Sequence, residues 1–369
     1  MNNKIKEQAQ NILKIVSLLA LIYLFLLSIK LFGGAFKMMG KGVAESIIRT
    51  VSNPILGLFV GIFTTSLVQS SSMTTSLVVG LVASGVFGAD PQAIQLAIPI
   101  VMGANIGTSV TNLLVSFGHI NNSMEFERAF PVSIVHDFFN VLAVIVIFPL
   151  QYFFNIIGII ACTISDLFVN VGGMVLFNPL GLIINPVSKA ILHLFPGAPW
   201  IPIIIAIILL FTALRYIVKV MKSLVLHKIE LFLDQYIFKS TARALFVGML
   251  FTAIVQSSSI TTSLVVPLAA AGVVSLRKIY PYDLGANIGT TITALLASMA
   301  TNSSAAISIA LSHLVFNVLG IAIFLPLKEI PITMAEVFTR WSMKNRYIPV
   351  IYVILVFFII PILIITIMR

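Results

Sequence analysis

One polar stretch, set in strongly apolar sequence, occurs twice in the chain. Residues 58–82 and residues 245–269 align without a gap, and 17 of their 25 positions are identical. Each copy contains Gln-Ser-Ser-Ser followed by two threonines and a fourth serine, at Gln69–Ser76 and Gln256–Ser263. Hydroxyl and amide groups are costly in hydrocarbon unless they find partners or line a wet cavity. The repetition of so costly a patch therefore constrains both the fold and the function.

The composition indicates a polytopic membrane protein. Hydrophobic residues make up 59% and charged residues 9% of the chain, whereas a soluble domain carries about 25% charged residues. The net charge of +10 comes from Lys and Arg between apolar runs, as the positive-inside rule expects, so nucleic acid is not predicted as a partner. The densest basic cluster, which we place on the cytoplasmic side, consists of Arg215, Lys219, Lys222, Lys228, Lys239 and Arg243. The single cysteine, Cys162, excludes an internal disulfide framework.

Two further motifs recur and define a pair of repeats. Gly-Ala-Asn-Ile-Gly-Thr occurs at Gly103–Thr108 and at Gly285–Thr290, and a His-x-x-x-Asn pair occurs at His136–Asn140 and at His313–Asn317. The expected organisation is an N-terminal helix with an interfacial segment (1–49), repeat 1 (50–150), connecting spans with a basic interfacial segment (151–241), repeat 2 (242–327), and an interfacial segment with the last span (328–369).

Each repeat is predicted to hold a re-entrant helical hairpin, a broken helix and a further span. The apolar halves around each Gln-Ser-Ser-Ser have about 15 residues, too few for a full crossing. We therefore predict hairpins over 54–86 and over 242–274, and Ser52-Asn53-Pro54 predicts a helix start with a side-chain cap and a proline. The glycines of Gly-Ala-Asn-Ile-Gly-Thr predict a local break in the helix. Five crossings separate the starts of the two copies, and this odd number predicts an all-α membrane protein of two inverted repeats.

The predicted turns suit a small oxyanion and Na⁺. Helix N-termini present free N–H groups and partial positive charge, and hydroxyls add hydrogen-bond donors. Neither motif contains Lys or Arg, so we expect bound cations to offset the charge of the anion. Amide, hydroxyl and backbone oxygens suit Na⁺, as does the carboxylate of Asp137, an ionisable group inside a span. Its counterpart in the second repeat is Leu314.

Other interpretations of the polar residues remain open. Serines and threonines in membrane helices also serve packing or bond to their own helix, and His136 and His313 suit a packing hydrogen bond as well as a ligand role. Duplication at corresponding positions favours ligand binding. A serine-nucleophile enzyme is not predicted, because the chain has no G-x-S-x-G elbow. A channel is also less favoured, because a selectivity filter would more naturally arise from oligomeric symmetry than from two copies of a motif within one chain.

The quoted motifs resemble those of the type II sodium-dependent phosphate cotransporters. The duplicated Gln-Ser-Ser-Ser is the signature of that family, and the resemblance extends over about 50–150 and 242–327. It implies Na⁺-coupled symport of inorganic, largely divalent phosphate by alternating access about a midplane site, with no cofactor beyond the transported Na⁺. Asp137 matches the aspartate of the electrogenic members, which implies an additional Na⁺ and net inward charge.

The resemblance also implies the site residues. Phosphate binding is assigned to Gln69, Ser70, Ser71, Ser72, Asn105, Gln256, Ser257, Ser258, Ser259 and Asn287. Sodium binding is assigned to Gln69, Thr74, Thr75, Asn105, Thr108, Asp137, Asn140, Gln256, Thr261, Thr262, Asn287, Thr290 and Asn317.

The chain departs from the family in two ways. The linker between the repeats is short and has Cys162 as its single cysteine. The last span lies at the end of the given sequence, so regulation by a soluble domain after it is not expected. Both departures predict a bacterial plasma (inner) membrane protein reduced to its transport core, in contact with lipid, phosphate and Na⁺; a homodimer stays open. The alternatives are a Na⁺-coupled carrier of another small oxyanion, such as sulfate, and a membrane sensor that binds phosphate without moving it.

Overall fold

The described part of the chain is helical, as the predicted all-α class requires. The structure is a computed structural model that describes residues 2–39, 53–87, 91–171, 179–229, 237–301 and 303–368. Its helices are α1 (Asn2–Met38), α3 (Pro54–Val68), α4 (Ser71–Ala83), α5 (Pro91–Phe117), α6 (Ser123–Phe154), α7 (Ile156–Val171), α8 (Pro179–Leu194), α9 (Trp200–Ile229), η1 (Ile237–Lys239), α10 (Thr241–Val255), α11 (Ser258–Ala270), α12 (Leu276–Met299), α13 (Ser304–Phe324), α14 (Glu329–Lys344), α15 (Tyr347–Ile354), η2 (Leu355–Ile359) and α16 (Ile360–Met368).

The chain forms a multi-pass membrane protein. Among the described residues, six helical segments are long and apolar enough to cross a membrane: Ile12–Met38, Ile94–Phe117, Ser123–Phe154, Trp200–Val220, Ser304–Phe324 and Tyr347–Met368. The last of these runs through α15, η2 and α16. The helices α3, α4, α10 and α11, which flank the two Gln-Ser-Ser-Ser motifs, are apolar but shorter. Most of the predicted interfacial segment after α1, from residue 40 onward, lies outside the described residues.

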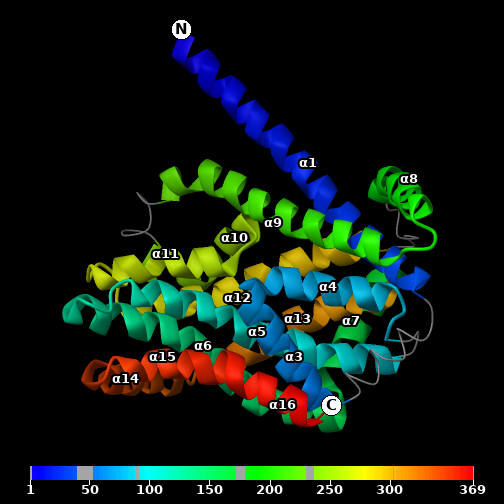
Figure 1. The fold of residues 1–369 in the computed structure, drawn as a ribbon. Coiled ribbons are helices and arrows are strands. Elements are labelled where there is room, and N and C mark those ends of the chain that lie inside the picture. Colours follow the sequence, from blue (N-terminus) through cyan, green and yellow to red (C-terminus); the bar gives the residue numbers. More distant parts are fainter. Residues whose placement is uncertain are drawn as a thin grey trace.

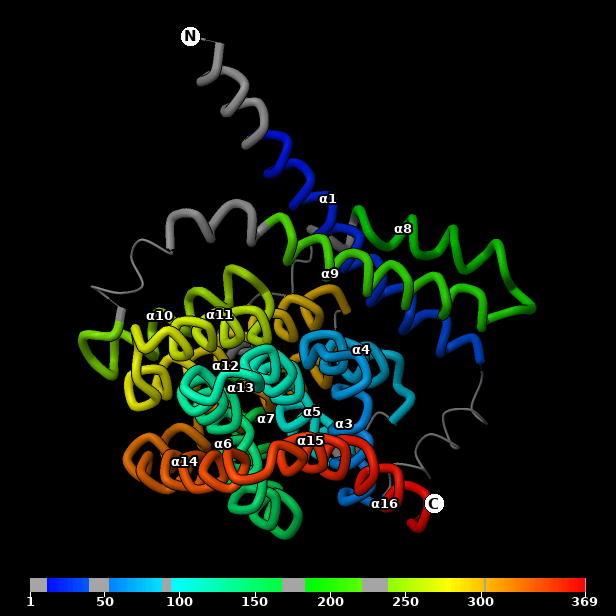
Figure 2. The backbone as a smooth tube through the Cα atoms, turned by 60° about the vertical axis from the view of Figure 1, so that its left-hand side comes forward, coloured from blue at the N-terminus to red at the C-terminus, as the bar shows by residue number. Residues whose placement is uncertain are grey.

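The helices form layers with the duplicated motifs in the middle. Helices α1 and α9 lie side by side across one face of the bundle, and α14, α15 and α16 cover the opposite face (Figure 1). From a second direction, α3 with α4 and α10 with α11 lie between these faces (Figure 2). The second helix of each pair contacts the other repeat, because α4 packs against α12 and α11 packs against α5. The two repeats are therefore interleaved.

The prediction of a helix broken at Gly-Ala-Asn-Ile-Gly-Thr is wrong, because α5 and α12 run through both motifs without interruption. The glycines instead allow close contact between helices. A Cβ atom on Gly103 would lie 2.0 Å from the carbonyl oxygen of Leu58 in α3, and one on Gly285 would lie 1.9 Å from the carbonyl oxygen of Leu245 in α10. Small residues that let helix backbones approach are a common packing device in membranes.

A Gly285→Ala variant is expected to be destabilised by about 1–3 kcal/mol, because the added methyl group overpacks the contact between α12 and α10. Thermal unfolding of the purified protein in detergent measures the effect as a lower Tm. The matched control is Gly197→Ala, since a Cβ atom at Gly197 meets nothing within 4 Å. Equal Tm values for the two variants would contradict the packing role of Gly285.

Candidate functional site

Both Gln-Ser-Ser-Ser motifs interrupt the helix in the same way. Gln69 ends α3 with φ 56° and ψ 30°, and Gln256 ends α10 with φ 60° and ψ 25°. This left-handed conformation is uncommon for residues other than glycine. The next residues, Ser70 and Ser257, are extended, and each hydroxyl caps the following helix by accepting a hydrogen bond from a backbone N–H three residues later. Each motif thus ends one helix and begins a second, as the sequence predicts.

The two turns face one cavity of about 810 Å³, which we call the turn cavity. Its lining includes corresponding residues of both copies: Gln69, Ser70 and Ser72, and Gln256, Ser257 and Ser259. Because the N-cap serines line the turn cavity, the N-terminal ends of α4 and α11 also lie at it. Helix N-termini with hydroxyl groups beside them form an environment that favours an anion. The other assigned serines, Ser71 and Ser258, are buried in the first turns of these helices, outside the lining.

Two basic side chains that the sequence analysis did not assign to the site also line the turn cavity. Arg215 and Lys219 are exposed residues of α9, four positions apart and therefore on one face of the helix. Neither takes part in an ion pair within the described part of the chain. The sequence places them only in the cytoplasmic basic cluster. Arg215 and Lys219 can therefore offset part of the charge of an anion in the turn cavity, so bound Na⁺ ions do not have to offset all of it.

A threonine from each repeat adds to the site, and the sequence analysis missed both. Thr293 of α12 donates a hydrogen bond to Oε1 of Gln256 at 2.7 Å and lies 3.5 Å from the hydroxyl of Ser72, so it connects the two turns. Thr111 follows the first Gly-Ala-Asn-Ile-Gly-Thr segment by three residues, as Thr293 follows the second, and it lines the turn cavity. The buried hydroxyl of Thr111 has no hydrogen-bond partner among the described residues. The sequence contained a signal for both residues, because a threonine recurs at the same distance after each Gly-Ala-Asn-Ile-Gly-Thr motif.

The asparagines of the repeated motifs form a buried network and do not line the turn cavity. Asn140 donates hydrogen bonds to the backbone oxygen of Asn105 at 3.0 Å and to the hydroxyl of Ser109 at 3.3 Å. Asn287 donates to Oδ1 of Asn140 at 2.9 Å, and Nε2 of His313 lies 3.2 Å from Oδ1 of Asn105. The network joins α5 and α6 of the first repeat to α12 and α13 of the second. Its buried amides therefore help to hold the repeats together.

The threonines assigned to sodium hydrogen-bond within the helix or helix pair that carries them, and the hydroxyl of Thr262 also lies 2.9 Å from Oδ1 of Asn112 in α5 of the other repeat. Thr75, Thr108, Thr262 and Thr290 donate to backbone oxygens one turn earlier. Thr74 and Thr261 pair with the hydroxyls of Thr65 and Thr252 at 2.9 and 2.7 Å. None of the six assigned threonines lines the turn cavity. These hydrogen bonds fit the packing role that the sequence analysis gave as the alternative to ion binding. A hydroxyl oxygen that donates a hydrogen bond still keeps lone pairs for a cation.

The buried carboxylates lie away from the lining of the turn cavity. Asp137 in α6 is fully buried, its Oδ2 accepts a hydrogen bond from the hydroxyl of Tyr352 at 2.5 Å, and its Oδ1 has no partner among the described residues. Asn317 donates to the backbone oxygen of His313, and its own Oδ1 is also buried without a partner in that part of the chain. Asp283 of α12, which the sequence analysis did not single out, is 2% exposed and also has an unpartnered Oδ1. Each of these three unpartnered Oδ1 atoms is free to coordinate a cation.

Comparison with known proteins gives one consistent result. The family model described as Na⁺/Pi-cotransporter matches the chain twice, over residues 24–175 and 209–360. Sodium-dependent phosphate transport protein 2A of Ovis aries is 32% identical over 440 aligned positions, which cover 97% of this chain and 68% of that protein. The protein 2A of Mus musculus is 31% identical with 98% and 68% coverage, and protein 2B of Homo sapiens is 30% identical with 95% and 65% coverage. No solved structure shows a significant match to the chain.

Proposed function

The chain belongs to the Na⁺/Pi-cotransporter family, and from this membership we propose that it carries inorganic phosphate together with Na⁺ through the turn cavity. The observation that carries the proposal is that both Gln-Ser-Ser-Ser turns, which are far apart in the sequence, line the same cavity. The phosphate oxygens accept hydrogen bonds from the serine hydroxyls, the glutamine amides and the first N–H groups of α4 and α11. The donors needed for a tetrahedral anion thus come from two opposed directions.

The transport mechanism follows from the paired architecture. We propose that α3 with α4 and α10 with α11 are re-entrant hairpins of two inverted repeats. In support, α3 and α10 have 15 residues and α4 and α11 have 13, so at about 1.5 Å per residue each is shorter than the roughly 30 Å hydrocarbon core. A site between the turns of two such hairpins lies near the bilayer midplane, where alternating access requires it.

Sodium is proposed to bind at buried oxygen atoms that lack other partners, one of them at the turn cavity and others outside its lining. Among the described residues these include Oδ1 of Asp137, Oδ1 of Asn317 and the hydroxyl of Thr111. An extra Na⁺ at Asp137 would make transport electrogenic, with net positive charge moving inward. The short linker between the repeats supports a bacterial plasma-membrane protein, although the relatives quoted above are mammalian.

The test of the function is uptake of radiolabelled phosphate into proteoliposomes that contain the purified protein. An inward Na⁺ gradient is expected to drive accumulation, and replacing Na⁺ with K⁺ or choline is expected to abolish it. Unlabelled arsenate, which is nearly isosteric with phosphate, should compete, whereas competition by sulfate would favour another small oxyanion as the substrate. Phosphate binding without accumulation, in protein shown to be folded, would overturn transport in favour of a sensor.

An Arg215→Gln/Lys219→Gln variant is expected to raise the KM for phosphate about fivefold with little change in maximal rate, because exposed charges contribute modestly to attraction. The difference from wild type should shrink at high ionic strength, where exposed charges are screened. The matched control is Arg340→Gln/Lys344→Gln on α14, which removes the same residue types at the same spacing from exposed positions outside the cavity. An unchanged KM in the Arg215→Gln/Lys219→Gln variant would contradict a role for these side chains.

A further inference from the structure

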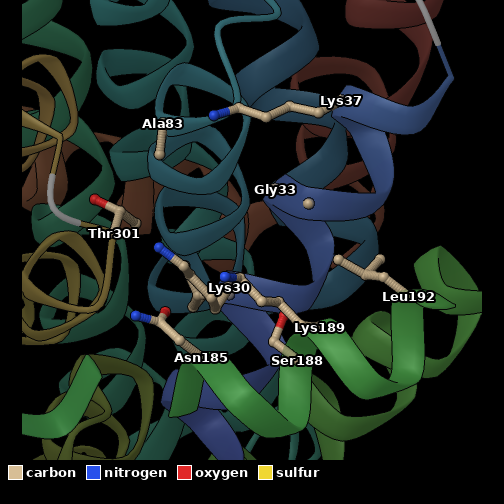
Figure 3. A pocket seen from close by; sticks show the side chains of 11 residues that line it. Lys30, Gly33, Lys37, Ala83, Asn185, Ser188, Lys189, Leu192 and Thr301 are labelled. Carbon is tan, nitrogen blue, oxygen red and sulfur yellow. The ribbon is translucent and has the colours of Figure 1, made fainter. Parts of the chain in front are cut away.

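A second cavity, of about 220 Å³, lies between α1 and α8 and extends to the end of α4 (Figure 3). We call it the lysine pocket, because Lys30 and Lys37 of α1 and Lys189 of α8 line it. It shares no lining residue with the turn cavity. The lysine pocket is therefore a separate site from the one proposed for the transported anion.

The lysine pocket concentrates positive charge without a matching carboxylate. None of its lining residues is acidic, and none of the three lysines forms an ion pair in the part of the chain that the structure describes. In Figure 3 the side chains of Lys30 and Lys189 extend into the pocket from two different helices. Like charges in a partly buried space repel each other and are costly to desolvate. An anion between them would offset the repulsion and give the partly desolvated ammonium groups a partner of opposite charge.

Neutral hydrogen-bonding groups complete the lining. Asn185 and Ser188 of α8 and Thr301, which follows α12, contribute an amide and two hydroxyls. Oδ1 of Asn185 is buried and has no hydrogen-bond partner among the described residues, and rotation of this amide would present its NH₂ group instead. Two helices, α1 and α8, and the loop after α12 thus bring polar side chains to one space. The volume of 220 Å³ equals that of about seven waters at roughly 30 Å³ each, which admits a phosphate group.

The presence of lysine at the pocket can be explained without a bound anion for only one of the three lysines, Lys37. A lysine near the end of a spanning helix can extend its ammonium group to the membrane surface. Lys37 is exposed and lies one residue before the end of α1, so it fits this explanation. Lys30 lies about two turns earlier, is half-buried, and shares the pocket with Lys189 from the facing helix. Its position calls for a partner inside the pocket.

We propose that the lysine pocket binds a phosphate group, either free phosphate or the headgroup of an anionic phospholipid. Both sources offer the same chemistry, namely negatively charged oxygen atoms that accept hydrogen bonds from ammonium, hydroxyl and amide groups. The bound group contacts α1, α8 and the region of Ala83 at the end of α4. It therefore ties the N-terminal helix to the first helix pair of the transport core.

The test compares the full chain with a Lys30→Gln/Lys189→Gln variant. In the first arm, binding of radiolabelled inorganic phosphate is measured in detergent with and without Na⁺. In the second arm, native mass spectrometry counts retained phosphatidylglycerol against phosphatidylcholine after both lipids are offered in equal amounts. Wild type is expected to hold one phosphate independently of Na⁺, or one phosphatidylglycerol. The double variant should bind that ligand about 30-fold more weakly, at about fivefold per lysine.

A Lys14→Gln/Lys344→Gln control removes the same charge elsewhere and should bind as wild type does. An effect in the first arm identifies free phosphate as the ligand, and an effect confined to the second arm identifies the lipid. Equal Na⁺-independent phosphate and phosphatidylglycerol binding in wild type and the Lys30→Gln/Lys189→Gln variant would overturn the proposal. Retained Na⁺-dependent phosphate binding shows that the variant is folded; if it does not fold, Lys189→Gln alone, at an exposed position of α8, replaces it with an expected fivefold loss.

Discussion

A Gln69→Ala/Gln256→Ala variant is expected to lose Na⁺-driven phosphate uptake, with kcat/KM at least about 100-fold below wild type. Both side chains line the turn cavity from corresponding positions of the two repeats. A hydrogen bond to a charged group contributes about 1.5–3 kcal/mol, which corresponds to a factor of roughly 10–100 for each glutamine. Initial rates of labelled phosphate uptake in proteoliposomes, normalised to folded protein, measure the effect.

The backbone at these glutamines requires a control, because both residues have positive φ, which costs alanine about 1–2 kcal/mol. A Gln69→Gly/Gln256→Gly variant removes the amides without that strain and is expected to be as inactive as the alanine variant. A Gln69→Asn/Gln256→Asn variant keeps amides and tolerates the left-handed conformation, so it should retain part of the activity. Gln95→Ala on α5 is the neutral control. Wild-type transport by the glycine variant would refute binding through the amides.

The sequence predicted well the features that local chemistry decides. A side-chain cap was predicted at Ser52-Asn53-Pro54, and Asn53 caps α3 there, with its Oδ1 accepting a hydrogen bond from the N–H of Ile55 at 2.9 Å. Capping depends on a side chain and its own neighbouring backbone. The helix end at each Gln-Ser-Ser-Ser was predicted from the length of the apolar runs. These signals lie within a few residues of the feature that they predict, so no knowledge of the packing was needed.

The sequence failed where one residue type has two structural uses. Glycine can relax the backbone locally or let another helix approach closely. The choice at Gly103 depends on Leu58, and the choice at Gly285 depends on Leu245. Both partners belong to other helices, and their contact follows only from the packing of α3 on α5 and of α10 on α12. Local composition therefore favoured a broken helix where the fold has a continuous one.

The basic side chains of the turn cavity were missed for a related reason. Arg215 and Lys219 fall near the end of an apolar run, where the positive-inside rule explains them without any ligand. Only the position of α9 brings them to the two turns. The duplicated motifs predicted that a pair of turns exists, whereas the helices of the connecting segment decide what closes the space between them. The duplicated motifs do not extend into this segment, so its role could not be inferred from them.

An Asp137→Gly variant is expected to lose net charge movement while keeping Na⁺-driven phosphate uptake. The carboxylate is fully buried, and within the described residues it contacts a tyrosine hydroxyl but no Lys or Arg. A buried charge without a partner of opposite sign is costly, and a bound Na⁺ would provide that partner. Because the variant lacks the carboxylate, it should carry about one positive charge less in each cycle.

The measurement is charge moved per phosphate, from currents and tracer uptake in the same proteoliposomes. An inside-negative potential of 100 mV supplies about 2.3 kcal/mol for each net charge, so it should raise phosphate accumulation by wild type but not by the Asp137→Gly variant. Tyr352→Phe removes the hydrogen bond and keeps the carboxylate, and it is expected to remain electrogenic. An unchanged charge per phosphate in Asp137→Gly would exclude this residue as the site of the extra Na⁺, because the charge would then be carried elsewhere.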